Sequence, residues 1–190
     1  MSRLEPKPRE ELDQEQQPLH DMFDAMATKV YGDLFTWKID GAEVGPMPVF
    51  LHQPKAGTAA WHLTVAVAQI KLSPDAKETA IVTVGAHHQA GYIVYCHERL
   101  ATAPGLLSEN QVTLIKKGEK PGDLNEGCSV AFDIAKRLTS TPGPMPPELW
   151  DRGVAVLGKD GVVGLLHYIG FYSYVSMFMN GTGVPVPEDN

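Results

Sequence analysis

The residues best suited to acid–base chemistry are concentrated in one segment, residues 78–97. Glu78 precedes the pair His87 and His88, and His97 closes the segment. An imidazole exchanges its proton near neutral pH, and a carboxylate beside it can orient it. The chemistry of a β-keto acid or an activated lactone needs little more. Loss of CO₂ leaves an enolate, which a positioned proton donor stabilises and then protonates.

Three further side chains are candidates for binding the substrate. Tyr92 and Tyr95 lie close enough in sequence to His88 to line the same pocket, and His167 is a candidate for anchoring a substrate carboxylate. Plain packing is an alternative explanation for each of the three. Cys96, in the same segment, is most simply explained as a small buried hydrophobic residue.

The two groups of greatest interest have structural explanations as well. Glu78 near the start of a helix is stabilised by the helix dipole, and His97 could be a core histidine bonded to a carbonyl. They meet only under a geometric condition, because nineteen residues of unbroken helix would separate them by about 28 Å. The chain must therefore fold back near Ala90 and Gly91, or a neighbouring subunit must join the two groups. Glycine weakens helix interiors and makes the break plausible.

The elements that position these residues are predicted to be helices throughout. Ser73 before Pro74 marks one helix start, and Ser108 with Gln111 forms a capping-box signature. No segment alternates strictly between apolar and polar residues, so no strand is required. We expect an all-α, single-domain protein over residues 1–190 with irregular tails at 1–9 and 181–190. The predicted helices are 10–35 with a break at Pro18, 49–53, 56–70, 73–103 with a break at 90–91, 108–118, 123–138, 147–157 and 160–180.

Composition excludes several classes of function. The net charge of −7 argues against a nucleic-acid partner, because phosphate binding needs a dense basic surface. Two cysteines, Cys96 and Cys128, match no disulfide framework, and the charged N-terminus lacks the apolar stretch of a secretory signal. We therefore expect a cytoplasmic protein that acts on a small molecule.

One apolar segment tests that expectation. Residues 162–179 carry no formal charge over 18 positions, the lower limit for a membrane span. The segment also contains His167, two serines and three tyrosines, and no basic cluster follows it. A helix that is apolar on every side also suits the core of an oligomer. We therefore expect a homo-oligomer rather than a membrane protein.

The histidines are also candidate metal ligands. His87, His88 and His97 cluster in sequence, and His62 could join them from the preceding helix, but no H-x-x-x-H or H-E-x-x-H pattern is present. Gly-rich phosphate loops and a Ser-His-Asp signature are also missing from the sequence. We expect neither a metal nor a cofactor.

Three segments in order resemble one known family. They are GPMPVFLHQP, LSPDAKETAIVTVGAHHQAGYIVYCHERLA and DGVVGLLHYIGFYSYVSMFMNGTGVPVP, and they lie within residues 45–187. This order is similar to that of the carboxymuconolactone decarboxylase-like proteins, which belong with the alkylhydroperoxidase D group. The resemblance implies a compact helical bundle with a break in its central helical element, at the place where Gly91 stands.

The resemblance also separates two kinds of chemistry. Peroxidase members carry a glutamate followed by Cys-x-x-Cys-x-x-x-His, and Glu78 and His97 stand at the matching positions, but Ala90 and Ile93 replace the cysteines. Peroxide reduction needs a thiolate and a resolving thiol, so the chain is not expected to be a thiol peroxidase. Decarboxylase members often place an acidic residue near the second cysteine position, and this chain has Ile93 there.

Three functional hypotheses follow. The first is a cofactor-free lyase or isomerase that uses acid–base chemistry on a small oxygenated carboxylate, lactone or polyketide-like metabolite, with His97, Glu78 and His88 as catalytic residues. The second is a non-catalytic small-molecule-binding or structural oligomer of the same fold. The third is a metal-dependent hydrolase or oxygenase. The first requires polar side chains that converge on a closed pocket.

Overall fold

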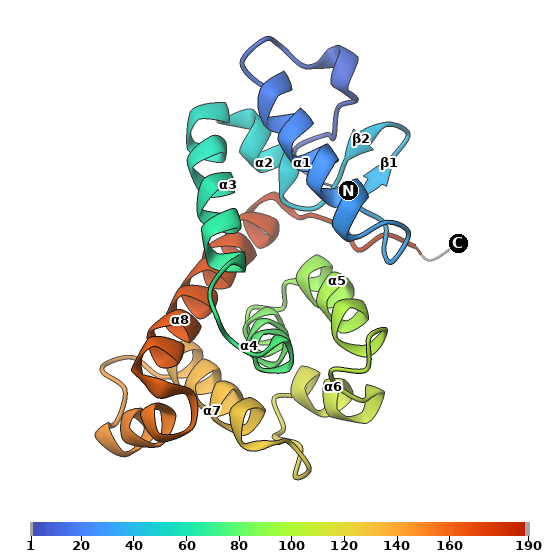
Figure 1. The fold of residues 1–190 in the computed structure, drawn as a ribbon. Coiled ribbons are helices and arrows are strands. Elements are labelled where there is room, and N and C mark those ends of the chain that lie inside the picture. Colours follow the sequence, from blue (N-terminus) through green and yellow to red (C-terminus); the bar gives the residue numbers. More distant parts are fainter. Residues whose placement is uncertain (1, 189–190) are drawn as a thin grey trace.

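The structure is a computed structural model that describes residues 2–188, and these residues fold almost entirely as helices (Figure 1). The all-α class predicted from the sequence is confirmed. The helices are α1 (Gln17–Val30), α2 (Met47–His52), α3 (Pro54–Ala68), α4 (Pro74–His87), α5 (Gly91–Thr102), α6 (Glu109–Lys116), α7 (Glu126–Ser140) and α8 (Pro147–Thr182), after a single 3₁₀ turn, η1 (Arg9–Glu11). A two-residue hairpin, β1 (Lys38–Ile39) and β2 (Ala42–Glu43), lies between α1 and α2.

Helix α4 is the centre of the fold and packs against α5, α6, α7 and α8. Every residue from Thr79 to Gly85 is buried, as a helix surrounded by other helices requires. Two threonines in this run satisfy their hydroxyls within the helix. Thr79 donates to the carbonyl of Asp75 at 2.8 Å, and Thr83 donates to the carbonyl of Thr79 at 2.6 Å. Their burial therefore leaves no hydroxyl without a partner.

The N-terminal segment forms a second layer over this bundle. Helices α1, α2 and α3 contact one another, and α3 also packs on the C-terminal part of α8 (Figure 1). Their apolar side chains join those of α5 and α8 in one large buried cluster, which includes Phe23, Trp61, Tyr92 and Phe171. The candidate site lies inside this cluster, between the two layers.

The chain reverses between α4 and α5 where the sequence predicted a break. Gln89 has a φ of 53°, and α5 begins at Gly91. Gly85 lets α5 approach closely, because a Cβ at this position would lie 2.9 Å from Cγ2 of Ile93. The predicted fold-back is therefore confirmed, and it places α5 directly against α4.

Helix α8 contains the apolar segment that raised the question of a membrane. Its 36 residues form two helical parts joined by a kink, with a mean hydropathy of 1.4 over the most apolar 18-residue window, and half of that window is buried in the fold. Its backbone leaves the helical conformation at Gly158, where φ is 72°, as the predicted helix end at this residue indicated. A core helix is also buried in this way. Length and composition alone are therefore weak evidence for a membrane span.

Several predicted boundaries are wrong. Pro18 does not break a helix but lies in the first turn of α1, where a missing N–H costs nothing. Helix α7 is capped by Asn125, whose side chain accepts the N–H of Cys128 at 2.9 Å, rather than by Asp123. The hairpin was missed because its strands have only two residues each. The N-terminal tail is also held in place, since the N–H of Arg3 donates to the carbonyl of Thr182.

Candidate active site

Glu78 and His97 meet across the α4–α5 reversal. Nδ1 of His97 lies 2.8 Å from Oε2 of Glu78, and the two side chains are only 12% and 15% exposed. An ionised carboxylate can only accept hydrogen bonds, so Nδ1 carries the proton. In the neutral imidazole, Nε2 then keeps a free lone pair and can act as a base. The predicted pair therefore exists within a single chain.

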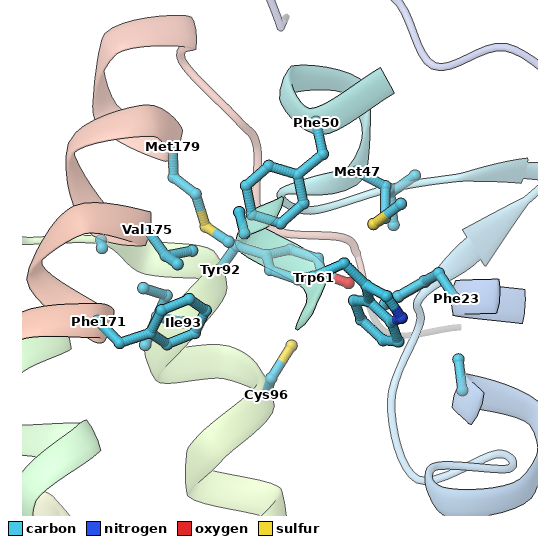
Figure 2. Packing of buried hydrophobic residues seen from close by; sticks show 14 of the residues in the cluster. Phe23, Met47, Phe50, Trp61, Tyr92, Ile93, Cys96, Phe171, Val175 and Met179 are labelled. Carbon is cyan, nitrogen blue, oxygen red and sulfur yellow. The ribbon is translucent and has the colours of Figure 1, made fainter. Parts of the chain in front are cut away.

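His97 also lines a partly open cavity of about 90 Å³. The walls come from α1, α2, α3, α5, α8 and the chain before the hairpin, and they are mainly aromatic and aliphatic (Figure 2). The lining residues are Phe23, Tyr31, Phe35, Trp37, Pro46, Met47, Phe50, Trp61, Thr64, Tyr92, Ile93, Cys96, His97, Leu100, Phe171, Tyr172, Val175 and Met179. Glu78 is not among them, so the carboxylate supports His97 from outside the cavity.

Two tyrosines on the cavity wall were not predicted as site residues. The ring of Tyr172 meets that of His97 edge to face, with centroids 4.9 Å apart. Burial raises the pKa of Tyr172 well above its usual range, and Tyr31 and Glu78 add to the rise. Burial, with smaller contributions from Cys96 and Glu78, raises the pKa of Tyr31 to about 12. Both phenols are therefore protonated at neutral pH and available as hydrogen-bond donors.

Cys96 also lines the cavity, although packing was the explanation expected for it. Figure 2 shows its side chain rising from α5 towards Trp61. Burial raises the pKa of the Cys96 thiol well above its usual range, so it is a neutral thiol rather than a thiolate. The other cysteine, Cys128, packs in a different cluster with Val82 and Phe132. Within the described residues, therefore, no second thiol lines this cavity.

Tyr92 and Tyr95 both hold the chain before the hairpin. The hydroxyl of Tyr92 donates to the carbonyl of Thr36 at 2.9 Å, while the N–H of Thr36 donates to the hydroxyl of Tyr95 at 3.1 Å. Only Tyr92 lines the cavity, and its ring lies against Gly45, where a Cβ would approach to 2.4 Å. Both hydroxyls therefore bind the backbone of Thr36, and the hydroxyl of Tyr92 also interacts with the thiol of Cys96.

The other predicted site residues lie elsewhere. His88 ends α4, its Nε2 is buried without a partner in the described part of the chain, and burial followed by the proximity of His87 lowers its pKa. It does not line the cavity. His167 is exposed on α8, in a shallow groove with Leu63 and Tyr174. His62 is exposed on α3, so the four histidines first considered for a metal do not gather into a site.

The arrangement defines a class of protein, a helical bundle with a partly buried carboxylate–histidine pair beside an apolar cavity. No family model and no curated protein sequence matches this chain. Among solved structures, the chain is similar to the debrominase Bmp8 in its apo form, with a TM-score of 0.74 and 14% identity, and the match covers 97% of this chain and 91% of that one.

A second structure of Bmp8 gives the same result. It is a Cys-to-Ala variant in complex with 2,3,4-tribromopyrrole, with a TM-score of 0.73, 14% identity and the same coverage of 97% and 91%. The likeness shows that this chain has the same helical fold as Bmp8.

Proposed function

We propose that this chain is an enzyme that transfers protons on a small cyclic substrate without a cofactor. The observation that supports the proposal is the position of His97, which is held by Glu78 at 2.8 Å and faces a cavity whose walls are mainly apolar. A histidine oriented by a carboxylate in a site shielded from water is the arrangement that general acid–base catalysis needs.

In the proposed reaction, Nε2 of His97 first acts as the base. It removes a proton from a carbon next to a carbonyl group, and the electron pair of the C–H bond moves onto the carbonyl oxygen to give an enolate. The imidazolium that forms is paired with the carboxylate of Glu78. The phenol of Tyr172 or Tyr31 can donate a hydrogen bond to the enolate oxygen. Return of the proton to another carbon completes an isomerisation.

The same groups serve a decarboxylation. Loss of CO₂ from a β-keto acid breaks a C–C bond, and its electron pair forms the enolate. In this case His97 begins protonated, pairs with the leaving carboxylate and then gives its proton to the enolate carbon. Among the described residues, no Lys or Arg lines the cavity, so a substrate with several carboxylates would find only one cation there. We therefore favour neutral or singly charged substrates.

The size of the cavity limits the substrate further. At about 90 Å³ it is smaller than the roughly 150 Å³ apolar cavity that holds benzene. Even a single five- or six-membered ring therefore needs flexible wall residues such as Met47 and Met179 to move. The tribromopyrrole bound to the Bmp8 variant is likewise one small ring, which supports a substrate of this class.

A binding protein without catalysis is the second candidate, because most of the cavity wall offers contact area rather than reactive groups. Deuterium exchange separates the two. Cyclic monoketones, five-membered lactones and cyclic β-keto acids are incubated with the protein in D₂O, and proton NMR follows the loss of the exchangeable C–H signal or the loss of the acid. We expect at least one member of the panel to react faster with the protein than without it.

Variants of His97 and Glu78 test whether the pair beside the cavity causes the acceleration. His97→Asn and Glu78→Gln should abolish the acceleration, and His62→Asn, at an exposed histidine on α3, should leave it unchanged. Ligands that bind, as judged by changes in tryptophan fluorescence from Trp61, but never exchange would favour the binding protein. Exchange that persists in His97→Asn would overturn the proposal.

A further inference from the structure

A second group of polar side chains is buried between α1 and the hairpin, and the proposed reaction makes no use of it. His20 and Asp24 lie one helical turn apart on the same face of α1, and Glu43 comes from β2. One ligand-type atom from each of the three lies within 4.8 Å of the others. Glu43 and His20 are 1% and 2% exposed, whereas Asp24 is partly exposed, so two of the three side chains are closed off from water.

This group has an unmet requirement for a positive charge or hydrogen-bond donors. Neither carboxylate oxygen of Glu43 has a hydrogen-bond partner in the described residues, and Nε2 of His20 has none either. The nearest approach, from Nε2 of His20 to Oε1 of Glu43, is 3.7 Å, which exceeds hydrogen-bond distance. Burial raises the pKa of Glu43 to about 8, and Asp24 adds to the rise. Buried carboxylates are normally paired or bound to metals.

The proton on His20 is fixed on the far side of the ring. Nδ1 of His20 lies 3.3 Å from Oδ1 of Asp21, which can only accept, so Nδ1 carries the hydrogen. Asp21 is itself held by Arg9, through two contacts of 2.6 and 2.8 Å. The lone pair of Nε2 therefore faces the oxygens of Glu43. A carboxylate that orients the opposite nitrogen in this way is a regular companion of metal-binding histidines.

We propose that Nε2 of His20 and the carboxylates of Asp24 and Glu43 bind one divalent first-row transition metal ion of the Zn²⁺ type. Zn²⁺ takes nitrogen and oxygen ligands at about 2.0–2.2 Å, so two ligands of a tetrahedral ion lie about 3.3 Å apart. The 3.7 Å between His20 and Glu43 is close to that value, and small side-chain rotations bring in Asp24.

One cation already neighbours the group. The ammonium of Lys38 pairs with Oδ1 of Asp24, and both side chains are one-third exposed. Oδ2 of Asp24 is left to bind the metal. The half-buried position of Asp24 also gives the ion its path from solvent, since the other two ligands are almost fully enclosed.

The ion would have a structural role. It joins α1 to β2, and thereby fixes the two segments that supply Phe23 and Trp37 to the cavity wall. Three protein ligands leave the fourth position of a tetrahedral ion to a water molecule, so the site differs from most structural Zn²⁺ sites, in which four side chains bind the ion. The proposal does not depend on the reaction proposed for His97, because none of the three ligands lines the cavity.

The test uses the full chain without an affinity tag, stripped with a chelator and dialysed. Titration calorimetry with ZnCl₂ should give one ion per chain, and the thermal unfolding midpoint should rise with Zn²⁺ and return to its starting value with chelator. Co²⁺ as a spectroscopic probe should give visible d–d absorption bands. Glu43→Gln and Asp24→Asn should each weaken Zn²⁺ binding at least tenfold. His87→Asn is the control and should bind Zn²⁺ normally.

Each alternative outcome is visible in the same experiments. Absence of a stoichiometric heat, or binding that survives both Glu43→Gln and Asp24→Asn, would overturn the proposal. Binding lost in His87→Asn would assign the metal to the surface histidines instead and also overturn it. Asp24→Asn keeps the test valid if Glu43→Gln does not fold, because the half-buried position of Asp24 tolerates the change. A site that binds Ca²⁺ as tightly as Zn²⁺ would contradict the transition-metal assignment.

Discussion

Nδ1 of His97 and Oε2 of Glu78 lie 2.8 Å apart although nineteen positions separate the two residues in the chain. They meet because α5 turns back against α4 after His88. In the proposed reaction the two side chains therefore act as one unit.

The first prediction concerns this unit. His97→Asn and Glu78→Gln should each lower turnover by about two to four orders of magnitude, because a positioned base and its orienting carboxylate act together. The double variant should be no worse than His97→Asn alone, since Glu78 has nothing left to orient. Steady-state rates on a substrate found by deuterium exchange provide the measurement. Additive losses in the double variant would contradict a shared role.

The second prediction concerns the thiols. Purified protein should show no thiol-dependent turnover of organic hydroperoxides, and Cys96 should react slowly with iodoacetamide at pH 8 until the protein is unfolded. The physical reason is that burial keeps the thiol protonated. Mass spectrometry of the alkylated protein measures the rate, with Cys96→Ser identifying the site. Robust peroxidase activity that disappears in Cys96→Ser would refute this prediction.

The third prediction tests the phenol beside His97. Tyr172→Phe removes one donor from the cavity wall without changing its shape, so turnover should fall about tenfold or more while the unfolding midpoint changes little. Tyr174→Phe, two residues away on the exposed face of α8, is the matched control and should behave as the unchanged protein. Equal effects of the two variants on turnover would remove Tyr172 from the proposed reaction.

The fourth prediction concerns Gly45. Its φ of 73° disfavours any side chain, and a Cβ would lie 2.4 Å from the ring of Tyr92. Gly45→Ala should therefore destabilise the fold by more than about 2 kcal/mol. Gly105→Ala separates the two causes, because Gly105 has the same φ of 73° with nothing within 4 Å. Chemical denaturation measures both, and similar losses would show that the contact with Tyr92 contributes little.

The fifth prediction is that the chain forms a homo-oligomer. One face of α3 and α8 exposes large apolar side chains, Leu63 at 44%, Val163 at 42% and Met177 at 63%. A surface of this kind favours association. Light scattering at micromolar concentration should give a particle larger than 20.7 kDa. Leu63→Glu should dissociate it, whereas Val30→Glu, at an exposed valine on α1, should not. A particle of one chain would show the prediction to be wrong.

Much of the fold could be predicted because its signals are local. The serine, glutamine and proline residues at helix ends, and the glycine at the reversal, act on backbone atoms within a few positions. Pro18 was misread because the same residue opens a helix or breaks one, and only the position of the first turn decides which. The hairpin carries too few residues for an alternating pattern.

The site was less accessible to sequence reasoning. Glu78 and His97 were chosen for their residue types and for their match to the family positions. Tyr31, at the end of α1, and Tyr172, in α8, come together only in the folded chain. No metal was expected because the histidines near residue 97 show no metal-binding spacing in the sequence. The cluster proposed here joins His20 and Asp24, whose four-residue spacing is visible in the sequence, to Glu43, whose approach depends on the hairpin. Partners of this kind cannot be paired before the tertiary structure is known.

The two hydrogen bonds to Thr36 have a consequence for access to the cavity. Phe35 and Trp37, on either side of Thr36, line the cavity, and the backbone of Thr36 is held to α5 by the hydroxyls of Tyr92 and Tyr95. The amide of Thr36 donates to a side chain rather than to a helix or sheet. Its hydrogen exchange therefore reports the opening of this wall, and the rate of that opening limits how fast a ligand that passes Thr36 can enter.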